Sequence, residues 1–221
     1  MNPEARRMAM VDRLSRTGVV RTEAVARALR EVPRHTFLGH LPVAVAYEDR
    51  AVTVKRAGDG PAISSISQPT MVALMLEDLQ VREGHQVLEV GAGTGYNAAL
   101  LAILVGSAGS VVSVELEPDL AQSARRHLSE VGADYVEVVT GDGSLGHPAR
   151  SPYDRIIVTA GARSVAPAWT QQLVEGGRMV VPIVDAHGKG SVIVFDKVGG
   201  ELVSGHETLC GFVPIRHTPI G

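Results

Sequence analysis

Between residues 85 and 184, short apolar runs alternate with longer segments that have a helical pattern. The runs HQVLEV, SVVSVEL, VEVVTGD, RIIVTA and RMVVPIV predict strands, and the ranges 96–106, 118–132 and 166–177 predict helices. Glycines 176 and 177 look like the end signal of the last helix. Repeated strand–helix units predict a parallel sheet that is covered on both faces. We therefore expect an α/β domain with a doubly wound, mostly parallel sheet.

The flanking segments predict an N-terminal helical extension and C-terminal antiparallel strands. Residues 2–32 predict two helices, with a break near Gly18 and Thr22 as the second N-cap. Residues 33–67 predict loop with short strands, and a helix follows over 68–79, where Pro69 suits the first turn. The runs SVIVFDKV and ELVSGHETL predict an antiparallel hairpin. We expect one domain over 1–221, with a helical and substrate-side extension (1–80), a cofactor-binding α/β core (81–184) and C-terminal strands (185–221).

Composition excludes several classes of function. A net charge of -3 gives no general electrostatic footprint for nucleic acid. The single cysteine, Cys210, permits neither an intrachain disulfide nor a zinc cluster built on several cysteines, and we expect no bound metal. No apolar run approaches the roughly 20 residues that span a bilayer, and the charged N-terminus lacks the apolar segment of a signal peptide. We expect a soluble, cytoplasmic monomer without nucleic-acid or membrane partners.

The stretch EVGAGTGYNAA, from Glu89 to Ala99, joins the first predicted strand of the core to a helix. Gly91, Gly93 and Gly95 let the backbone approach a ligand, and the helix N-terminus adds partial positive charge. A dinucleotide fingerprint would place its last glycine where Tyr96 stands. Glu89 disfavours a pyrophosphate and suits a cofactor with positive charge. S-adenosylmethionine (SAM) carries a sulfonium and an ammonium and no phosphate, so we expect it as the cofactor.

Two later acidic residues also follow strands. Glu115 ends the next strand, 20 residues after Gly95, where it is expected to accept hydrogen bonds from both ribose hydroxyls. Asp142, followed by Gly143, comes after the third strand and is expected to face the adenine. Alone, the glycine run is also consistent with a structural turn and each carboxylate with a solvated strand end. Together they lie in order at the strand ends where such sheets bind ligands. The pattern E-x-G-x-G-x-G resembles the first motif of class I SAM-dependent methyltransferases.

Longer segments resemble one family in particular. VPRHTFLGH, AYEDRAV and ISQPTMVALMLEDL precede the glycine loop, and GDGSLGHPARSPYDRIIVTAGA, LVEGGRMVVPI and GFVPI follow it. These segments are similar to the protein-L-isoaspartate O-methyltransferase family, over residues 32–215. The resemblance implies a SAM-dependent carboxyl methyltransferase whose substrate is a peptide or protein with an L-isoaspartyl residue. Methylation of that residue would start succinimide-mediated repair.

The resemblance also assigns the substrate side of the site. Ser67, in ISQP, matches the family's catalytic position, and its hydroxyl would orient the substrate carboxylate. A carboxyl group has a pKa of about 4 and is already ionised at neutral pH. Alignment of the carboxylate with the methyl group is therefore sufficient for the reaction, and no general base is needed. Ser65, Gln68 and Val213 are expected to bind the substrate. The alternative interpretation is that Ser67 only caps the helix that begins at Pro69.

The sequence departs from the family pattern before Ser67. The link AVTVKRAGDGPAISSISQP is several residues longer, and Ser64 and Ser65 replace the Gln-Thr pair of the family's QTISQP. This change leaves a second hypothesis open, a dedicated methyltransferase of a normal aspartate in a ribosomally made peptide, whose ester cyclises to an aspartimide. A third hypothesis is a SAM-binding module without catalysis, against which Ser67 and the complete cofactor motifs argue. We expect the repair activity.

Overall fold

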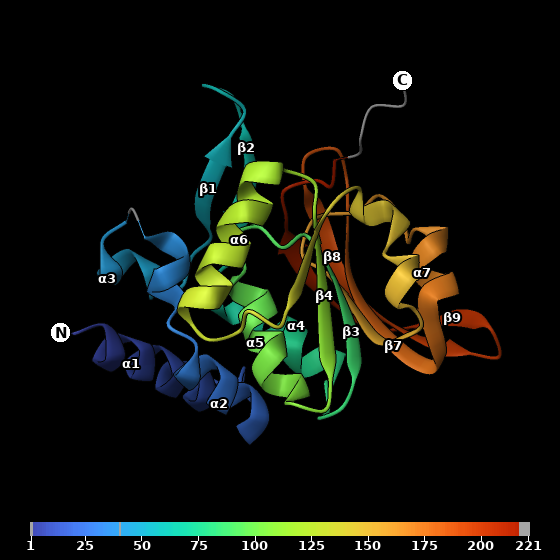
Figure 1. The fold of residues 1–221 in the computed structure, drawn as a ribbon, viewed down its shortest axis with the longest axis horizontal. Helices are drawn as coiled ribbons and strands as arrows, with labels where there is room; N and C mark the ends of the chain where they lie inside the picture. Colours follow the sequence, from blue (N-terminus) through green and yellow to red (C-terminus); the bar gives the residue numbers. More distant parts are fainter. Residues whose placement is uncertain (1, 40, 217–221) are drawn as a thin grey trace.

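The computed structural model describes residues 2–39 and 41–216. In this part of the chain, a seven-stranded sheet has the order β5-β4-β3-β6-β7-β8-β9 (Figure 1). Strands β3 to β7 run parallel to one another, whereas β8 and β9 are antiparallel. Their bounds are β3 Gln86–Val90, β4 Ser110–Glu115, β5 Glu137–Thr140, β6 Tyr153–Val158, β7 Leu173–Val184, β8 Lys189–Val198 and β9 Glu201–Gly211. This topology confirms the predicted doubly wound sheet with C-terminal antiparallel strands.

Helices cover both faces of the sheet. The α-helices are α1 Pro3–Arg16, α2 Glu23–Glu31, α3 Val43–Ala46, α4 Pro69–Leu79, α5 Tyr96–Val105, α6 Pro118–Glu130 and α7 Pro167–Gln172. The larger buried cluster packs α1, α2, α4, α5 and α6 on one face, and the smaller cluster packs α7 on the other. Figure 1 shows α6 and α7 on opposite sides of β4. Three 3-10 helices complete the described helices: η1 Arg34–Leu38, η2 Gly143–Leu145 and η3 Pro148–Arg150.

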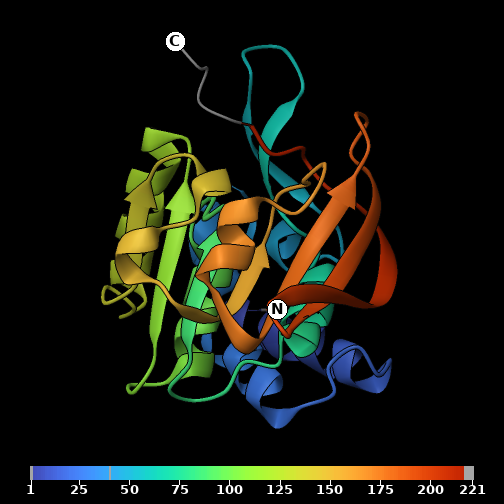
Figure 2. The same cartoon turned by 90° about the vertical axis from the view of Figure 1, so that its right-hand side faces the viewer.

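The N-terminal extension has the predicted pair of helices. Thr22 caps α2, since its Oγ1 accepts a hydrogen bond from the Val25 amide at 3.3 Å. Between residues 33 and 67, the predicted short strands are present as the hairpin β1 (Val52–Arg56) and β2 (Ala62–Ile66). The helical turns η1 and α3 in the same range were not predicted. Figure 2 shows the hairpin projecting above the edge of the sheet at which the parallel strands end.

The prediction of a helix over 166–177 is wrong after residue 172. Helix α7 ends at Gln172, and Leu173 takes an extended backbone with φ -83° and ψ 135°. Leu173 is buried and pairs with Tyr153, and a bulge separates this pair from the next one. Lys197 Nζ donates to the carbonyls of Thr170 and Leu173, each at 2.8 Å, and so satisfies the helix end. The two glycines therefore belong to a bulged strand, with Gly176 at φ 72°.

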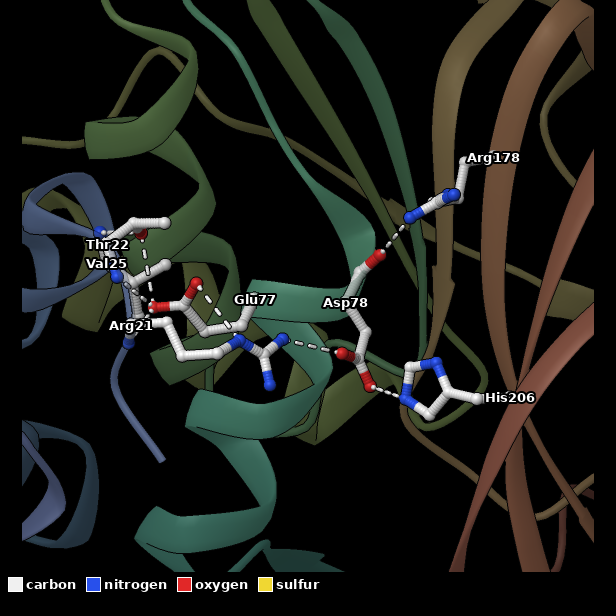
Figure 3. A network of polar contacts seen from close by, with 7 residues as sticks. All are labelled: Arg21, Thr22, Val25, Glu77, Asp78, Arg178 and His206. Atoms are coloured by element: carbon white, nitrogen blue, oxygen red, sulfur yellow. Dashed lines mark hydrogen bonds and ion pairs between the residues drawn. The ribbon is translucent and has the colours of Figure 1, made fainter. Parts of the chain in front are cut away.

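A polar network fixes the C-terminal end of α4 to the rest of the molecule (Figure 3). Glu77 Oε1 accepts hydrogen bonds from the amides of Arg21 at 2.8 Å and Thr22 at 2.9 Å. Asp78 Oδ1 pairs with the Arg21 guanidinium at 2.8 Å, and Asp78 Oδ2 lies 3.1 Å from His206 Nε2 on β9. Both carboxylates are buried, so these contacts satisfy groups that water does not reach. The helix that follows Ser67 is thereby joined to the N-terminal extension and to the edge strand.

Candidate active site

A cavity of about 510 Å³ lies at the carboxyl ends of β3, β4 and β6. The β1–β2 hairpin, the start of α4 and the C-terminal segment form its other walls. Predicted site residues from both sides meet in its lining: Ser65, Ser67, Gln68, Gly91, Gly93, Glu115, Gly143 and Val213. The ends of parallel strands are where sheets of this type bind ligands. The cavity therefore brings the predicted cofactor residues and the predicted substrate residues to one place.

The glycine loop follows β3 and leads into α5. Gly91, Gly93 and Gly95 all have positive φ, at 102°, 55° and 98°. A Cβ at Gly91 would lie 2.6 Å from Thr159 Oγ1, and Gly95 is the N-cap of α5. Gly95 itself is not among the described lining residues, although its neighbours Thr94 and Tyr96 are. The glycines are required because larger residues would be strained or would clash, and the loop exposes backbone to the cavity.

Glu115 ends β4 and is held in place by backbone amides. Its Oε2 accepts from Gly93 N at 2.7 Å, and its Oε1 accepts from Glu117 N at 3.0 Å. The residue is 8% exposed. Burial raises the pKa of Glu115, and the amides of Glu117 and Gly93 oppose that rise. Since each carboxylate oxygen has two lone pairs, Glu115 keeps acceptor capacity for hydroxyl groups in the cavity.

Glu89 lies beneath the glycine loop rather than in the described cavity lining. It is fully buried, its Oε1 accepts from Asn97 Nδ2 at 2.9 Å, and its Oε2 accepts from the Ser113 hydroxyl. Desolvation raises the pKa of Glu89 to about 7, although both hydrogen bonds oppose the rise. Asn97 does line the cavity, so Glu89 orients a cavity residue. Asn97 and Ser113 were not predicted. Ser113 is the register partner of Glu89 on the neighbouring strand, a pairing that only the structure shows.

Asp142 caps a short helix beside the cavity. Its Oδ1 accepts from the amide of Ser144 at 2.9 Å and from the Ser144 hydroxyl at 2.7 Å. Asp142 is not among the described lining residues, whereas Gly143 is. A Cβ at Gly143 would lie 2.5 Å from Val90 Cγ1, so only glycine fits this part of the wall. Asp142 thus shapes the turn that brings Gly143 to the cavity.

Ser67 lies between β2 and α4 and lines the cavity. The alternative that Ser67 caps α4 is wrong, because the N-cap residue is Gln68, and the Gln68 side chain makes no capping hydrogen bond. The side chain of Asp49 caps the helix instead. Its Oδ1 accepts from Thr70 N at 2.9 Å, and its Oδ2 accepts from Thr70 Oγ1 at 2.6 Å. The Ser67 carbonyl accepts from Arg34 at 2.8 Å, and no hydrogen bond among the described residues engages the Ser67 hydroxyl. That hydroxyl is therefore available to a ligand.

The sequence matches the model of the family described as Protein-L-isoaspartate(D-aspartate) O-methyltransferase (PCMT) over residues 5–218. The chain belongs to this family. It is 43% identical over 210 residues to the protein-L-isoaspartate O-methyltransferase of Methanopyrus kandleri, with 95% of this chain and 90% of that protein covered. It is 44% identical over 183 residues to protein-L-isoaspartate O-methyltransferase 1 of Archaeoglobus fulgidus, with 83% and 82% covered.

Solved structures agree with this assignment. A protein-L-isoaspartate O-methyltransferase superposes with a TM-score of 0.86 at 36% identity, over 95% of this chain and 66% of that longer chain. A chain from Plasmodium falciparum, solved in complex with S-adenosyl-L-homocysteine, superposes with a TM-score of 0.82 over 99% of this chain and all of that one. At 19% identity, this second likeness shows the fold alone.

Within the PCMT family, the altered link of this chain forms one wall of the cavity. The link spans β1, the turn after it and β2, and Ser64 and Ser65 line the cavity from β2. Ser64 Oγ would lie 3.6 Å from a Cβ placed on Gly93, so the hairpin reaches over the glycine loop. The link therefore lies beside both Ser67 and the glycine loop. None of the described helices is long and apolar enough to cross a membrane. Among the described residues, no cluster of metal-ligating side chains is present.

Proposed function

We propose that this chain is a SAM-dependent protein carboxyl O-methyltransferase that acts on L-isoaspartyl residues and so starts their succinimide-mediated repair. One observation carries the proposal: Ser67 and Glu115 line the same cavity as the glycine loop. A carboxylate at Ser67 and a cofactor at Glu115 would therefore meet without any movement of the fold. The membership of the PCMT family and the names of the relatives support the substrate class.

The residues present fit the cofactor. Glu115 offers acceptors for the ribose, Gly91 and Gly93 offer backbone to the cavity, and Gly143 offers a wall without a side chain. The buried carboxyl of Glu89 favours a positively charged ligand over a pyrophosphate when it is ionised. The bound S-adenosyl-L-homocysteine of the Plasmodium falciparum structure supports the same assignment. When bound, SAM supplies an electrophilic methyl group. Asp142 and Gly95 would act by shaping the loops.

The substrate carboxylate needs orientation rather than activation. With a reference pKa of about 4 it is ionised at neutral pH, so no protein group has to remove a proton. Ser67 would donate its hydroxyl hydrogen to one carboxylate oxygen and leave the other free to attack. Ser65, Gln68 and Val213 would hold the flanking peptide. Glu115 and the glycine loop would hold SAM, which would supply the methyl group to the carboxylate oxygen and keep the electron pair of the broken carbon–sulfur bond on its sulfur. Proximity and alignment thus supply the rate increase.

A matched pair of peptides tests the proposal. One peptide carries an L-isoaspartyl residue and its twin carries normal aspartate, and each is incubated with methyl-labelled SAM. We expect base-labile label in the isoaspartyl peptide only. Label in the aspartyl twin alone would instead indicate a dedicated aspartyl methyltransferase that leads to an aspartimide. Binding of S-adenosylhomocysteine without transfer to either peptide would indicate a non-catalytic module.

We further propose that the enzyme is a cytoplasmic monomer without a nucleic-acid partner, with residues 1–80, 81–184 and 185–221 as the substrate-side, cofactor-binding and C-terminal parts of one domain. Met1, His40 and residues 217–221 lie outside the described residues. Size-exclusion chromatography with light scattering tests the monomer. A mass twice that of the chain would contradict it.

A further inference from the structure

Arg34 is a buried cation without a carboxylate partner. It lies in η1 and is 0% exposed, and it takes part in no ion pair among the described residues. Burial lowers the pKa of Arg34, which records the unfavourable desolvation of its charge. A buried guanidinium without a counter-ion is costly, and methionine or leucine would fill such a space more favourably. The residue therefore calls for an explanation other than packing.

The hydrogen bonds of Arg34 reach two carbonyls on either side of the hairpin. Nε donates to the Ala46 carbonyl at 2.7 Å, and one terminal nitrogen donates to the Ser67 carbonyl at 2.8 Å. The other terminal nitrogen is buried and makes no hydrogen bond of ordinary geometry among the described residues, although the Tyr96 hydroxyl acts on the guanidinium. The planar guanidinium presents these donors in a rigid fork, so the two carbonyls are held at a fixed distance from one another. The side chain of Arg34 thus joins Ala46, at the end of α3, to Ser67, which lines the cavity.

The same guanidinium also contacts the cofactor side. Its central carbon lies 4.9 Å from the ring centre of Tyr96, within the range of a cation–π contact. Tyr96 is the first residue of α5, directly after the glycine loop, and it lines the cavity. Its hydroxyl is buried, and the Arg34 guanidinium acts on it and opposes the rise in the Tyr96 pKa that burial causes. Arg34 therefore lies between the loop assigned to the cofactor and the peptide unit that carries Ser67.

We propose that Arg34 is a positioning residue that acts through Ser67. By fixing the Ser67 carbonyl, it sets the orientation of that peptide unit and aims the serine hydroxyl into the cavity. Ser67 needs such support because it follows the last residue of β2 and precedes the N-cap of α4, so neither element's hydrogen bonds hold it. The inference rests on the proposed function, in which Ser67 orients the substrate carboxylate.

A double-mutant cycle separates this role from simple packing. The isoaspartyl methylation rate is measured for the wild type, Ser67→Ala, Arg34→Met and the double variant. We expect Arg34→Met to lower kcat by about 10-fold or more in the wild-type background and by less than about 3-fold when Ser67 is already alanine. Affinity for S-adenosylhomocysteine is measured in parallel and is expected to stay within about 3-fold of the wild type. A merely structural arginine would lower kcat by the same factor in both backgrounds, and that result would overturn the proposal.

Arg178→Met is the matched control. Arg178 also donates to a backbone carbonyl of α4, that of Asp78 at 3.2 Å, but at the far end of the helix (Figure 3). Its effect on kcat should be the same in both backgrounds. If Arg34→Met does not fold, Arg34→Lys completes the cycle, because it keeps the charge but cannot span both carbonyls. Wild-type protein that binds S-adenosylhomocysteine yet methylates no isoaspartyl peptide would refute the proposed function. Full activity of Ser67→Ala would refute the Arg34 inference while leaving that function intact.

Discussion

Glu115 and Gly93 are joined by a hydrogen bond of 2.7 Å from the glycine amide to Oε2, although 22 positions separate them in the sequence. The bond ties the end of β4 to the glycine loop that follows β3. Because the second carboxylate oxygen accepts the Glu117 amide, Glu115 is oriented before any ligand arrives. Such preorganisation reduces the ordering that binding would otherwise require.

The first prediction concerns this carboxylate. Glu115→Ala removes the proposed acceptors for the ribose hydroxyls and should weaken binding of S-adenosylhomocysteine by about 1.5–3 kcal/mol, the range for hydrogen bonds to a charged group. Isothermal titration calorimetry measures the loss. Glu130→Ala, which removes an exposed partner of Arg126 on α6, is the control and should leave the affinity unchanged. Wild-type affinity in a folded Glu115→Ala variant would contradict the assignment.

The second prediction concerns Ser67. Ser67→Ala should lower kcat/KM for an isoaspartyl peptide by roughly 10- to 1000-fold, or about 1.4–4 kcal/mol of transition-state stabilisation. Cofactor affinity should not change, because the proposed cofactor contacts lie on other loops. As the pH increases, the wild-type rate should rise through the pKa of the substrate carboxyl group, about 4, and then stay constant through neutral pH, since no general base is involved. Initial rates at subsaturating peptide test both points. Full activity of the variant would remove Ser67 from the mechanism.

The strands of the core were predictable because each is a short apolar run that ends at a polar or glycine-rich turn. The end of α7 was not. A glycine pair after a helical pattern usually ends a helix, but here Leu173 pairs with β6 and Lys197, from β8, satisfies the carbonyls of the helix end. Both partners are distant in the sequence, so tertiary contacts override the local signal. The turns η1 and α3 likewise depend on long-range contacts, among them the bond from Arg34 to Ala46.

The site was predictable where residue type and strand position together decide the chemistry. Glu115, Ser67 and the glycine loop lie in or beside one cavity, as expected from the ends of parallel strands. Sequence alone could not tell that Glu89 faces Ser113 and Asn97 beneath the loop, because a fully buried strand has no polar alternation to mark its faces. Nor could it reveal that Asp49, rather than Ser67, serves the N-terminus of α4.

The third prediction concerns the pH dependence of stability. Burial raises the pKa of Glu89 from 4.5 to about 7, so between these values the folded protein holds a proton that the unfolded chain has lost. The contribution of Glu89 to the free energy of unfolding is therefore present below about pH 4.5 and is lost as the pH rises towards 7. The loss is on the order of 3 kcal/mol, since one pH unit corresponds to about 1.4 kcal/mol.

Glu89→Gln isolates the contribution of Glu89 ionisation to the free energy of unfolding, because glutamine has the same shape and cannot ionise. Urea unfolding of both proteins at several pH values between 4.5 and 8 gives the difference in their free energies of unfolding. We expect the wild type to lose stability relative to the variant as the pH rises through this range. A difference that is independent of pH would show that Glu89 does not titrate there.

The last prediction concerns Glu117, which joins the two segments that cover the cavity. Lys55 on β1 donates to its Oε2 at 2.5 Å, and Arg216 in the C-terminal segment donates to its Oε1 at 2.8 Å. The hydrogen bonds from Lys55 and Arg216 lower the pKa of Glu117, so both pairs persist at neutral pH.

Partly exposed pairs contribute about 0.2–1 kcal/mol each. Glu117→Gln should therefore speed dissociation of S-adenosylhomocysteine by about 2- to 30-fold at low ionic strength. In the wild type the dissociation rate should also rise with added salt, because salt screens the pairs, whereas in the variant it should rise less, because only the pair of Lys55 with Asp119 remains. Release of labelled ligand into an excess of unlabelled ligand measures both rates, with Glu130→Gln as the control for loss of a surface carboxylate. Equal rates and equal salt dependence in Glu117→Gln and the wild type would show that the hairpin and the C-terminal segment do not control access to the cavity.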